Sequence, residues 1–475
     1  ISSSLGGLLL SEHYPIVTRG SVNIAVGDSL RLSDMQSGQV CPISCTNTVD
    51  YNNIRRELWK ASDYMYKYSL GVMSNKMNFL ANNPMPEEEV GIPDMLTMKP
   101  SVYIQQDSQD TISYSYLQGL GKRLSAIFAK YPDLYNTSVN ILSKNTVNYR
   151  ETSENIKQKS LHGFVELSAY ASVRTPDGSE ISDHIDRIVC SDKELDSDKL
   201  TDLVKRFADR LVKLHQSEAL NDYYVGPIMY EDDMISNTLS NIVVPLLTAK
   251  RTVQDNSGIS SLLVGKRIFD KHLNIDQLTD MPVFDSMKLL GNFNCDADGV
   301  VPAKRLSLLS GGFVKQLICG RYPALNCLRS TGNDRFFDDP DVIGTGVVPG
   351  ILRMYGDAEE PFAKMKQILC KEAKEKGLKV TYIVREPSGL TPCLYRVNVA
   401  TGEEKLVRVN EIPTPSKGDL LHIVAMSKEE NIQNTIINRI GSTIISPRAL
   451  IIENIECYFK KPKQEMAFPI EPPKN

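Results

Sequence analysis

Residues 223–335 carry the feature that most constrains the fold, because short apolar runs alternate there with glycines. Runs such as YYVGPIMY, LLVGKRIF and LLSGGFVKQL have the length of single strands, and glycine between such runs permits tight turns. This pattern favours β-sheet. Asn221 and Asp222 stand just before the region. We therefore predict a first domain over 1–219 and a β-rich second domain over 220–475.

The first domain alternates between helical and strand patterns. Apolar spacing predicts helices over 51–82, over 114–130 and from Asp196 or Ser197 to about 214, with Asp50 as the N-cap of the first. Residues 138–190 alternate as strands do, with Asp177-Gly178 as a hairpin turn. The predicted fold class is α+β: an N-terminal sheet with covering helices, then a β-rich domain with one helix over 359–376.

Composition excludes some partners and leaves the compartment open. The formal charge of −4 over 475 residues gives no reason to expect nucleic acid or an anionic membrane surface. No apolar run approaches the roughly 20 residues that span a bilayer. The sequence starts at Ile1, so the chain is expected in the periplasm if a signal peptide has been removed and otherwise in the cytoplasm.

The nine cysteines favour free thiols. They are odd in number and thinly spread, which is not the pattern of a disulfide framework. Cys41 and Cys45 form the one close pair, and they are either two thiols or a disulfide. A set of unpaired thiols leans towards a reducing compartment.

Several catalytic motifs are absent from the sequence. No two of the six histidines lie within five residues, so no helix presents a histidine pair to a metal. His184, between acids in SDHID, is interpreted as a solvated strand residue. GxGxxG, the phosphate loop GxxxxGK[ST] and the nucleophile elbow GxSxG do not occur.

Glu231, Asp232 and Asp233 form the most informative acidic group. Three acids at the start of a helix interact favourably with its dipole, which is one interpretation. The other interpretation is that they face a cleft, in which case Tyr230 and Glu231 lie on a concave surface. The sequence alone leaves both open.

The glycine-rich stretch resembles the TldD/PmbA family, whose older names refer to gyrase modulation and peptide maturation. The resemblance covers most of the chain. Its motifs are YVGPIMYE from Tyr224 to Glu231, GKRI at 265–268, DADGVV at 296–301, LLSGGFVKQL at 308–317, STGN-x-R from Ser330 to Arg335, and the strand ALIIENI at 449–455. Their order and spacing make the set specific.

The catalytic branch of that family is a zinc peptidase that uses a His-Glu-x-x-x-His helix and a distant cysteine. Here the matching positions hold Tyr230, Glu231 and Ile235, and the cysteine should fall near Gly441-Ser442, where the chain has none. Zinc needs three protein ligands and an open position for water. The resemblance therefore implies that this chain has no catalytic residues, metal ligands or cofactor of its own, with zinc expected only in a catalytic partner.

The resemblance implies a non-catalytic subunit that forms part of a peptide-binding chamber. Peptide would contact Tyr224, Tyr230, Glu231, Asp232 and Arg335. The chain would form a homodimer, or a heterodimer with a zinc-bearing relative. One alternative is an active hydrolase in which Glu231 works with Asp232 or Asp233 and a partner-supplied metal. The other alternative is a scaffold that holds an extended peptide by strand pairing.

Overall fold

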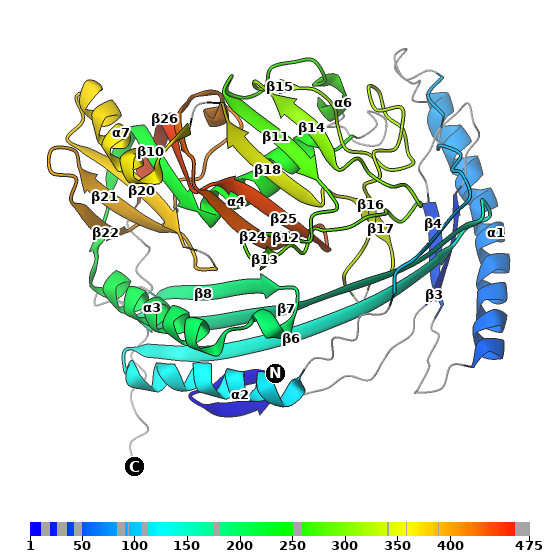
Figure 1. The fold of residues 1–475 in the computed structure, drawn as a ribbon, viewed down its shortest axis with the longest axis horizontal. Coiled ribbons are helices and arrows are strands. Elements are labelled where there is room, and N and C mark those ends of the chain that lie inside the picture. Colours follow the sequence, from blue (N-terminus) through cyan, green and yellow to red (C-terminus); the bar gives the residue numbers. More distant parts are fainter. Residues whose placement is uncertain are drawn as a thin grey trace.

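The first sheet forms the base of the molecule. In the computed structural model, the described residues are 1–10, 20–25, 36–41, 50–82, 91–93, 95–106, 113–174, 180–249, 259–339, 342–357, 359–387 and 389–460. The sheet has the order β2-β1-β6-β7-β5, with β8 also paired to β7. Its strands are β1 (Ser2–Ser4), β2 (Gly7–Leu10), β5 (Ser101–Ile104), β6 (Leu134–Glu151), β7 (Ile156–Arg174) and β8 (Glu180–Val189). Long β6 and β7 cross beneath the C-terminal half (Figure 1).

Two helices cover this sheet with an apolar stripe. α2 (Tyr114–Ser125), extended by the 3-10 turn Ala126–Lys130, and α3 (Ser197–Gln216) match the predicted helices. Asp196 caps α3 by accepting hydrogen bonds from the backbone N–H groups of Asp198 and Lys199, at 2.9 and 3.1 Å. Phe128 meets Phe207 edge to face, with ring centroids 6.0 Å apart, and so joins the two helices over the sheet.

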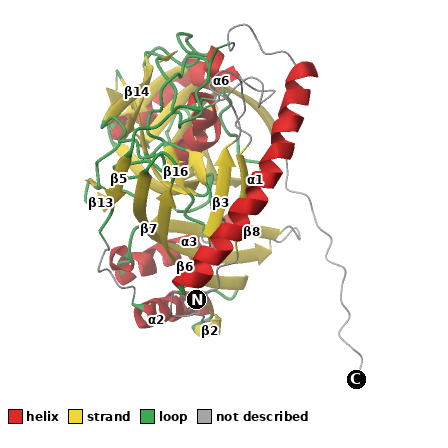
Figure 2. Cartoon of the chain, turned by 90° about the vertical axis from the view of Figure 1, so that its right-hand side faces the viewer, coloured by secondary structure: helices red, strands yellow, loops and turns green. Residues whose placement is uncertain are grey.

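The third predicted helix stands apart. α1 (Tyr51–Asn82) has the predicted bounds, and Asp50 accepts hydrogen bonds from the backbone N–H groups of Asn52 and Asn53. It packs on the hairpin β3 (Gly20–Ala25) and β4 (Gln36–Cys41), at the far end of β6 and β7 (Figures 1 and 2). The prediction that helices cover the N-terminal sheet therefore holds for α2 and α3, whereas α1 packs on a separate hairpin.

Two larger sheets build the C-terminal half. The eight-stranded sheet has the order β19-β23-β26-β10-β20-β21-β22-β9, and the six-stranded sheet has the order β15-β14-β11-β18-β25-β24. The first comprises β9 (Glu218–Ala219), β10 (Asp222–Asp232), β19 (Glu359–Glu360), β20 (Val380–Glu386), β21 (Cys393–Asn398), β22 (Glu404–Arg408), β23 (Ile423–Ser427) and β26 (Ala449–Phe459). The second comprises β11 (Leu273–Leu278), β14 (Arg305–Ser310), β15 (Phe313–Val314), β18 (Ile351–Gly356), β24 (Glu430–Ile437) and β25 (Ile440–Pro447). One large apolar core includes residues of both sheets.

The α+β class with a β-rich C-terminal half is confirmed. The remaining strands pair as short hairpins, β12 (Val283–Phe284) with β13 (Met287–Lys288) and β16 (Asp334–Phe336) with β17 (Thr345–Val347). α7 (Phe362–Glu375) is the helix predicted over 359–376. The expectation of one helix there is wrong, because α4 (Asp233–Thr238), a π-helical segment (Leu239–Val243) and α5 (Val244–Leu247) follow β10, and α6 (Ile259–Leu262) comes later. α4 is buried on nearly all sides and therefore has no amphipathic stripe.

Some predictions concern residues that lie outside the part of the chain that the structure describes. These are Asp177-Gly178, the side chain of Cys41 and all of Cys45. None of the helices within the described residues is long and apolar enough to cross a membrane. The 219/220 boundary stays a prediction.

Candidate functional site

β10 runs through the centre of the eight-stranded sheet, between β26 and β20. Strand alternation turns Ile228 and Tyr230 into the main core, while Met229 faces the opposite side with α7. Tyr230 is fully buried, and its hydroxyl has no hydrogen-bond partner among the described residues. Tyr224 is also buried, and its hydroxyl donates to the carbonyl of Pro227 at 2.7 Å. Both tyrosines therefore lie in the core.

Glu231 is a buried carboxylate with a fixed partner. It is 2% exposed and pairs with Arg385 of β20, which donates through Nε and, at 3.3 Å, through Nη2. Burial raises the pKa of Glu231, and the hydrogen bonds from Arg385 oppose that change. Arg385 also reaches Glu404 at 3.1 Å. The acid is thus held inside an ion-pair network.

Asp232 and Asp233 turn the chain from β10 into α4. Asp232 has a positive φ of 57° and pairs with Arg448 at 3.1 Å. Asp233 is 2% exposed and accepts hydrogen bonds from the backbone N–H of Gly389 and from Nδ2 of Asn431, both at 2.8 Å. Of the three acids, Asp233 lines a cavity.

The cavity lies where β8 of the first sheet meets the C-terminal half, and its volume is about 250 Å³. Its wall combines β8, the start of α4, the turn between β20 and β21, and β24. The lining residues are His184, Asp186, Arg187, Ile188, Asp233, Asn237, Met287, Glu386, Gly389, Leu390, Thr391, Ile432, Gln433, Asn434 and Thr435. β24 is the last strand of its sheet, and β8 pairs with β7 on one side, so an edge of each strand borders the cavity. The edge of β8 is partly occupied, because Ile185 forms an antiparallel bridge with Leu390.

Gly389 brings the two halves together at this point. Its N–H donates to Asp233, and its carbonyl accepts from the N–H of Asp186 at 2.7 Å. Its φ is +78°, and a Cβ there would lie 2.7 Å from the carbonyl oxygen of Asp186. Only glycine can adopt this positive φ and also avoid a clash with the carbonyl oxygen of Asp186.

Three ionisable groups in the wall have shifted pKa values. Burial, followed by the charge of Asp233, raises the pKa of Glu386 to about 8. Burial likewise raises the pKa of Asp233. A hydrogen bond to Asp186 raises the pKa of His184, and the two side chains are 3.1 Å apart. The wall can therefore exchange protons near neutral pH, and it offers oxygen acceptors to a polar ligand.

Arg335 lies away from this cavity. It is 3% exposed, stacks over the ring of Phe293 at 4.6 Å and donates to the carbonyl of Pro349 at 3.2 Å. Burial lowers its pKa to about 10. Within the described residues, Nε and Nη2 have no hydrogen-bond partner.

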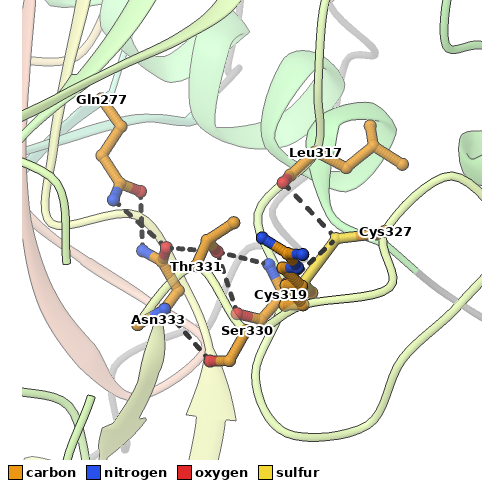
Figure 3. The surroundings of a disulfide bond; sticks show 9 residues. Gln277, Leu317, Cys319, Cys327, Ser330, Thr331 and Asn333 are labelled. Atoms are coloured by element: carbon orange, nitrogen blue, oxygen red, sulfur yellow. Dashed lines mark hydrogen bonds between the residues drawn. A yellow bond between two sulfur atoms is a disulfide. The ribbon is translucent and has the colours of Figure 1, made fainter. Parts of the chain in front are cut away.

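The segment before Arg335 is fixed by its own polar groups and by a disulfide. Thr331 accepts from the N–H of Cys319 and donates to Asn333, each at 2.8 Å, and Asn333 donates to Gln277 at 2.6 Å (Figure 3). Cys319 and Cys327 are joined, eight residues apart. The expectation of unpaired thiols throughout is wrong here, because the turn between the two cysteines brings them together. Cys190, Cys295, Cys370, Cys393 and Cys457 are free.

The positions that the resemblance assigns to zinc ligands do not fit zinc. Tyr230, Ile235 and Ser442 are buried, and they offer a phenol, an alkyl group and a hydroxyl that donates to the carbonyl of Pro349 at 2.9 Å. These are not the imidazole and thiolate donors that zinc prefers. Over the described ranges, no group of three His, Cys, Asp or Glu side chains could hold a metal ion.

The predicted peptide-contacting residues are therefore scattered. Tyr224, Tyr230, Glu231 and Asp232 share β10 but do not line the cavity, and Arg335 lies elsewhere. Their role in substrate binding stays a prediction. Sequence reasoning missed Glu386, Asn237 and Asn434 as a group. Its interpretation of His184 as a solvated strand residue is confirmed, because His184 lies on β8 and its side chain is 52% exposed. Only the neighbouring acids of His184 gave a local signal.

The comparisons with known proteins agree with this architecture. Residues 224–373 match the profile described as the PmbA/TldA metallopeptidase C-terminal domain. A Thermotoga maritima protein described as a candidate modulator of a DNA gyrase superposes with a TM-score of 0.59 at 14% identity, over 96% of this chain and 92% of its own. TldE from Thermococcus kodakarensis gives 0.54 at 14% identity, over 92% and 93%. A Bacteroides thetaiotaomicron protein, also described as a candidate gyrase modulator, gives 0.55 at 13%, over 93% and 88%. No curated protein sequence matches the chain.

Proposed function

Because this chain belongs to the TldD/PmbA family, we propose that it is a subunit that binds peptide and does not itself cut it. This proposal rests on one observation, which is the chemistry of the side chains at the positions where zinc ligands are expected. Tyr230 and Ile235 are buried in the apolar core, and Ser442 is buried with its hydroxyl bonded to a backbone carbonyl. A zinc-bound hydroxide needs ligands that these residues do not supply.

The cavity between the two halves is the site where peptide would bind. It is bordered by the edges of β8 and β24, whose backbone groups could pair with an extended chain. The predicted contacts at Tyr224, Tyr230, Glu231 and Asp232 would act from behind its wall, by holding β10. Arg335, on β16, would contact peptide away from this cavity. The assembly would be a homodimer, or a heterodimer with a zinc-bearing relative that performs any cleavage.

Metal analysis and native mass spectrometry of the purified protein test this proposal. We expect no stoichiometric zinc on the 53.0 kDa chain itself. We also expect an assembly of two chains, and no peptide turnover by the isolated chain. Turnover that chelators abolish would contradict the proposal and favour an active hydrolase. In that case Asp233→Asn should remove turnover if the acids near α4 are responsible.

The strand edges at the cavity also favour the second candidate, a scaffold that retains one peptide intact. That function predicts peptide-dependent protection of β24 or β8 amides in hydrogen exchange, without any catalytic partner in a pull-down. Recovery of a zinc-bearing relative in stoichiometric amount would favour the first candidate.

A further inference from the structure

We propose that the cavity between β8, α4 and β24 binds a primary ammonium group, supplied by a peptide N-terminus or by a lysine side chain. This inference rests on the proposed function for the expectation that the ligand is a peptide, and it adds which chemical group of the peptide is recognised.

Two carboxylates in the wall, the buried Asp233 and the partly buried Glu386, receive hydrogen bonds only from neutral donors. Asp233 accepts from the N–H of Gly389 and from Asn431, and Glu386 accepts from Asn237 at 2.9 Å. Within the described ranges, neither carboxylate has an ion-pair partner. By contrast, Glu231, which lies on β10 two residues before Asp233, is paired with Arg385. A buried carboxylate that lacks a cation is unfavourable. A cationic ligand in the cavity would supply that cation.

The shape of an ammonium group fits the acceptors present. It has three N–H donors and no acceptor, so it needs three oxygen atoms around it. Asp233 and Glu386 provide two, and Gln433 in the same wall has a side-chain oxygen without a hydrogen-bond partner among the described residues. A metal ion fits less well, because the described residues contain no group of three acidic, histidine or cysteine side chains that could hold one.

The remaining charges in the wall permit this assignment. Asp186 pairs with His184 at 3.1 Å on β8, so these two largely offset each other when His184 is protonated. Arg187, on the same strand, is the other cation that lines the cavity, and its charge acts to lower the pKa of Asp233. Arg210, behind the wall, is paired with Asp183. Asp233 and Glu386 thus remain the two acids in the wall that have no ion-pair partner among the described residues.

Binding of an ammonium group should release a proton. The pKa of Glu386 is about 8, because it is buried and lies near Asp233, so at pH 7 the free protein holds a proton there. An ammonium group favours the ionised carboxylate and would displace that proton. His184, Asp186, Arg187 and Asp233 are the other ionisable groups that face the site, and the charges of His184 and Arg210 act to lower the pKa of Glu386.

Calorimetric titration of the full chain at pH 7 tests the proposal with three peptides. These are trialanine amide with a free N-terminus, its N-acetyl form, and N-acetyl-Ala-Lys-Ala amide. We expect one or both peptides with an amine to bind at least tenfold more tightly than N-acetyl trialanine amide, and which one binds identifies the source of the amine. The heat should depend on the ionisation enthalpy of the buffer, as proton release requires.

The variants are Glu386→Gln, which is isosteric, and Glu375→Gln as the matched control on the exposed surface of α7. We expect Glu386→Gln to lower the affinity about tenfold and to remove the buffer dependence, and Glu375→Gln to change neither. Thermal unfolding of each variant checks that it is folded, and Asp233→Asn should repeat the loss if Glu386→Gln does not fold.

Equal affinity for the acetylated and free peptides would overturn this inference and leave the proposed peptide binding intact. Unchanged affinity in folded Glu386→Gln would overturn it as well. Absence of binding by all three peptides would overturn it together with the peptide-binding part of the proposed function.

Discussion

Glu231 and Arg385 are register partners on the parallel strands β10 and β20, and the guanidinium pairs with both oxygens of the buried carboxylate. Glu231 is 2% exposed, so the pair replaces the water that the carboxylate loses on folding. The resemblance matches Glu231 to a general base, but its two oxygens are occupied here. This relationship between two residues makes the acid a structural element of the sheet.

Arg385→Met should lower the free energy of unfolding by about 3 kcal/mol, because it leaves Glu231 buried without a cation. The double variant Glu231→Gln/Arg385→Met should regain most of that loss. Arg353→Met is the matched control, since Arg353 pairs with Glu430 at 2.8 Å on another strand but is 39% exposed. Its loss should be about 1 kcal/mol or less. Denaturant unfolding measures all three, and equal losses in the two single variants would contradict the assignment.

Local patterns account for what could be predicted from the sequence. The helix over 51–82 was found with its predicted bounds, because both its apolar spacing and its cap at Asp50 lie within the segment itself. The helices α2 and α3, which cover the first sheet, follow in the same way. α4 gave no such signal, because burial on nearly all sides removes the amphipathic stripe.

The cavity could not be predicted, because its wall comes from segments that are distant in sequence. His184, Asp233, Glu386 and Gln433 are brought together by contacts between sheets. The carboxylates on β10 illustrate the same limit. Sequence shows three acids in a row, but only tertiary structure shows that Arg385 neutralises one, Arg448 pairs with the second, and the third lines the cavity.

Tyr230→Phe should raise the free energy of unfolding by about 1 kcal/mol. The hydroxyl of Tyr230 is buried without a hydrogen-bond partner among the described residues, and removal of an unsatisfied group is favourable. Tyr224→Phe, the same substitution on the same strand, should instead cost about 1 kcal/mol, because it removes the hydrogen bond to Pro227. Thermal unfolding compares the two variants. The same sign of change in both would show that Tyr230 has a partner.

Gly389→Ala should loosen the contact between the two halves of the chain. Gly389 combines a φ of +78° with a backbone oxygen 2.7 Å from the position of a Cβ. We expect a loss of at least about 2 kcal/mol and faster hydrogen exchange of the Asp186 amide, which donates to the carbonyl of Gly389. Gly402→Ala is the control, since its φ is +72° but nothing lies within 4 Å, and it should cost about 1 kcal/mol. Equal costs would mean that the close approach to β8 contributes nothing.

Asp334 should make the stability of the protein fall as the pH rises towards 8. Arg150 of β6 lies 3.1 Å from Asp298 and 3.8 Å from Asp334, so the group joins the first sheet to the C-terminal half. Burial, followed by the charge of Asp298, raises the pKa of Asp334 to about 8 from its ordinary value of 3.8. Between these values the folded protein holds a proton that the unfolded chain has released. The stabilisation is therefore complete below about pH 4 and is lost as the pH rises through about 8.

Asp334→Asn should remove this contribution, so the slope of unfolding free energy against pH between 5 and 8 should become less negative by up to about 1.4 kcal/mol per pH unit, the limit for one proton. Asp280→Asn is the control, since Asp280 pairs with Lys304 on the surface and is 46% exposed. Urea unfolding at pH 5, 6, 7 and 8 measures the slope in each protein. A slope in Asp334→Asn equal to that of the parent would mean that Asp334 is ionised in the folded state throughout this range, with Arg150 strong enough to offset both burial and the charge of Asp298.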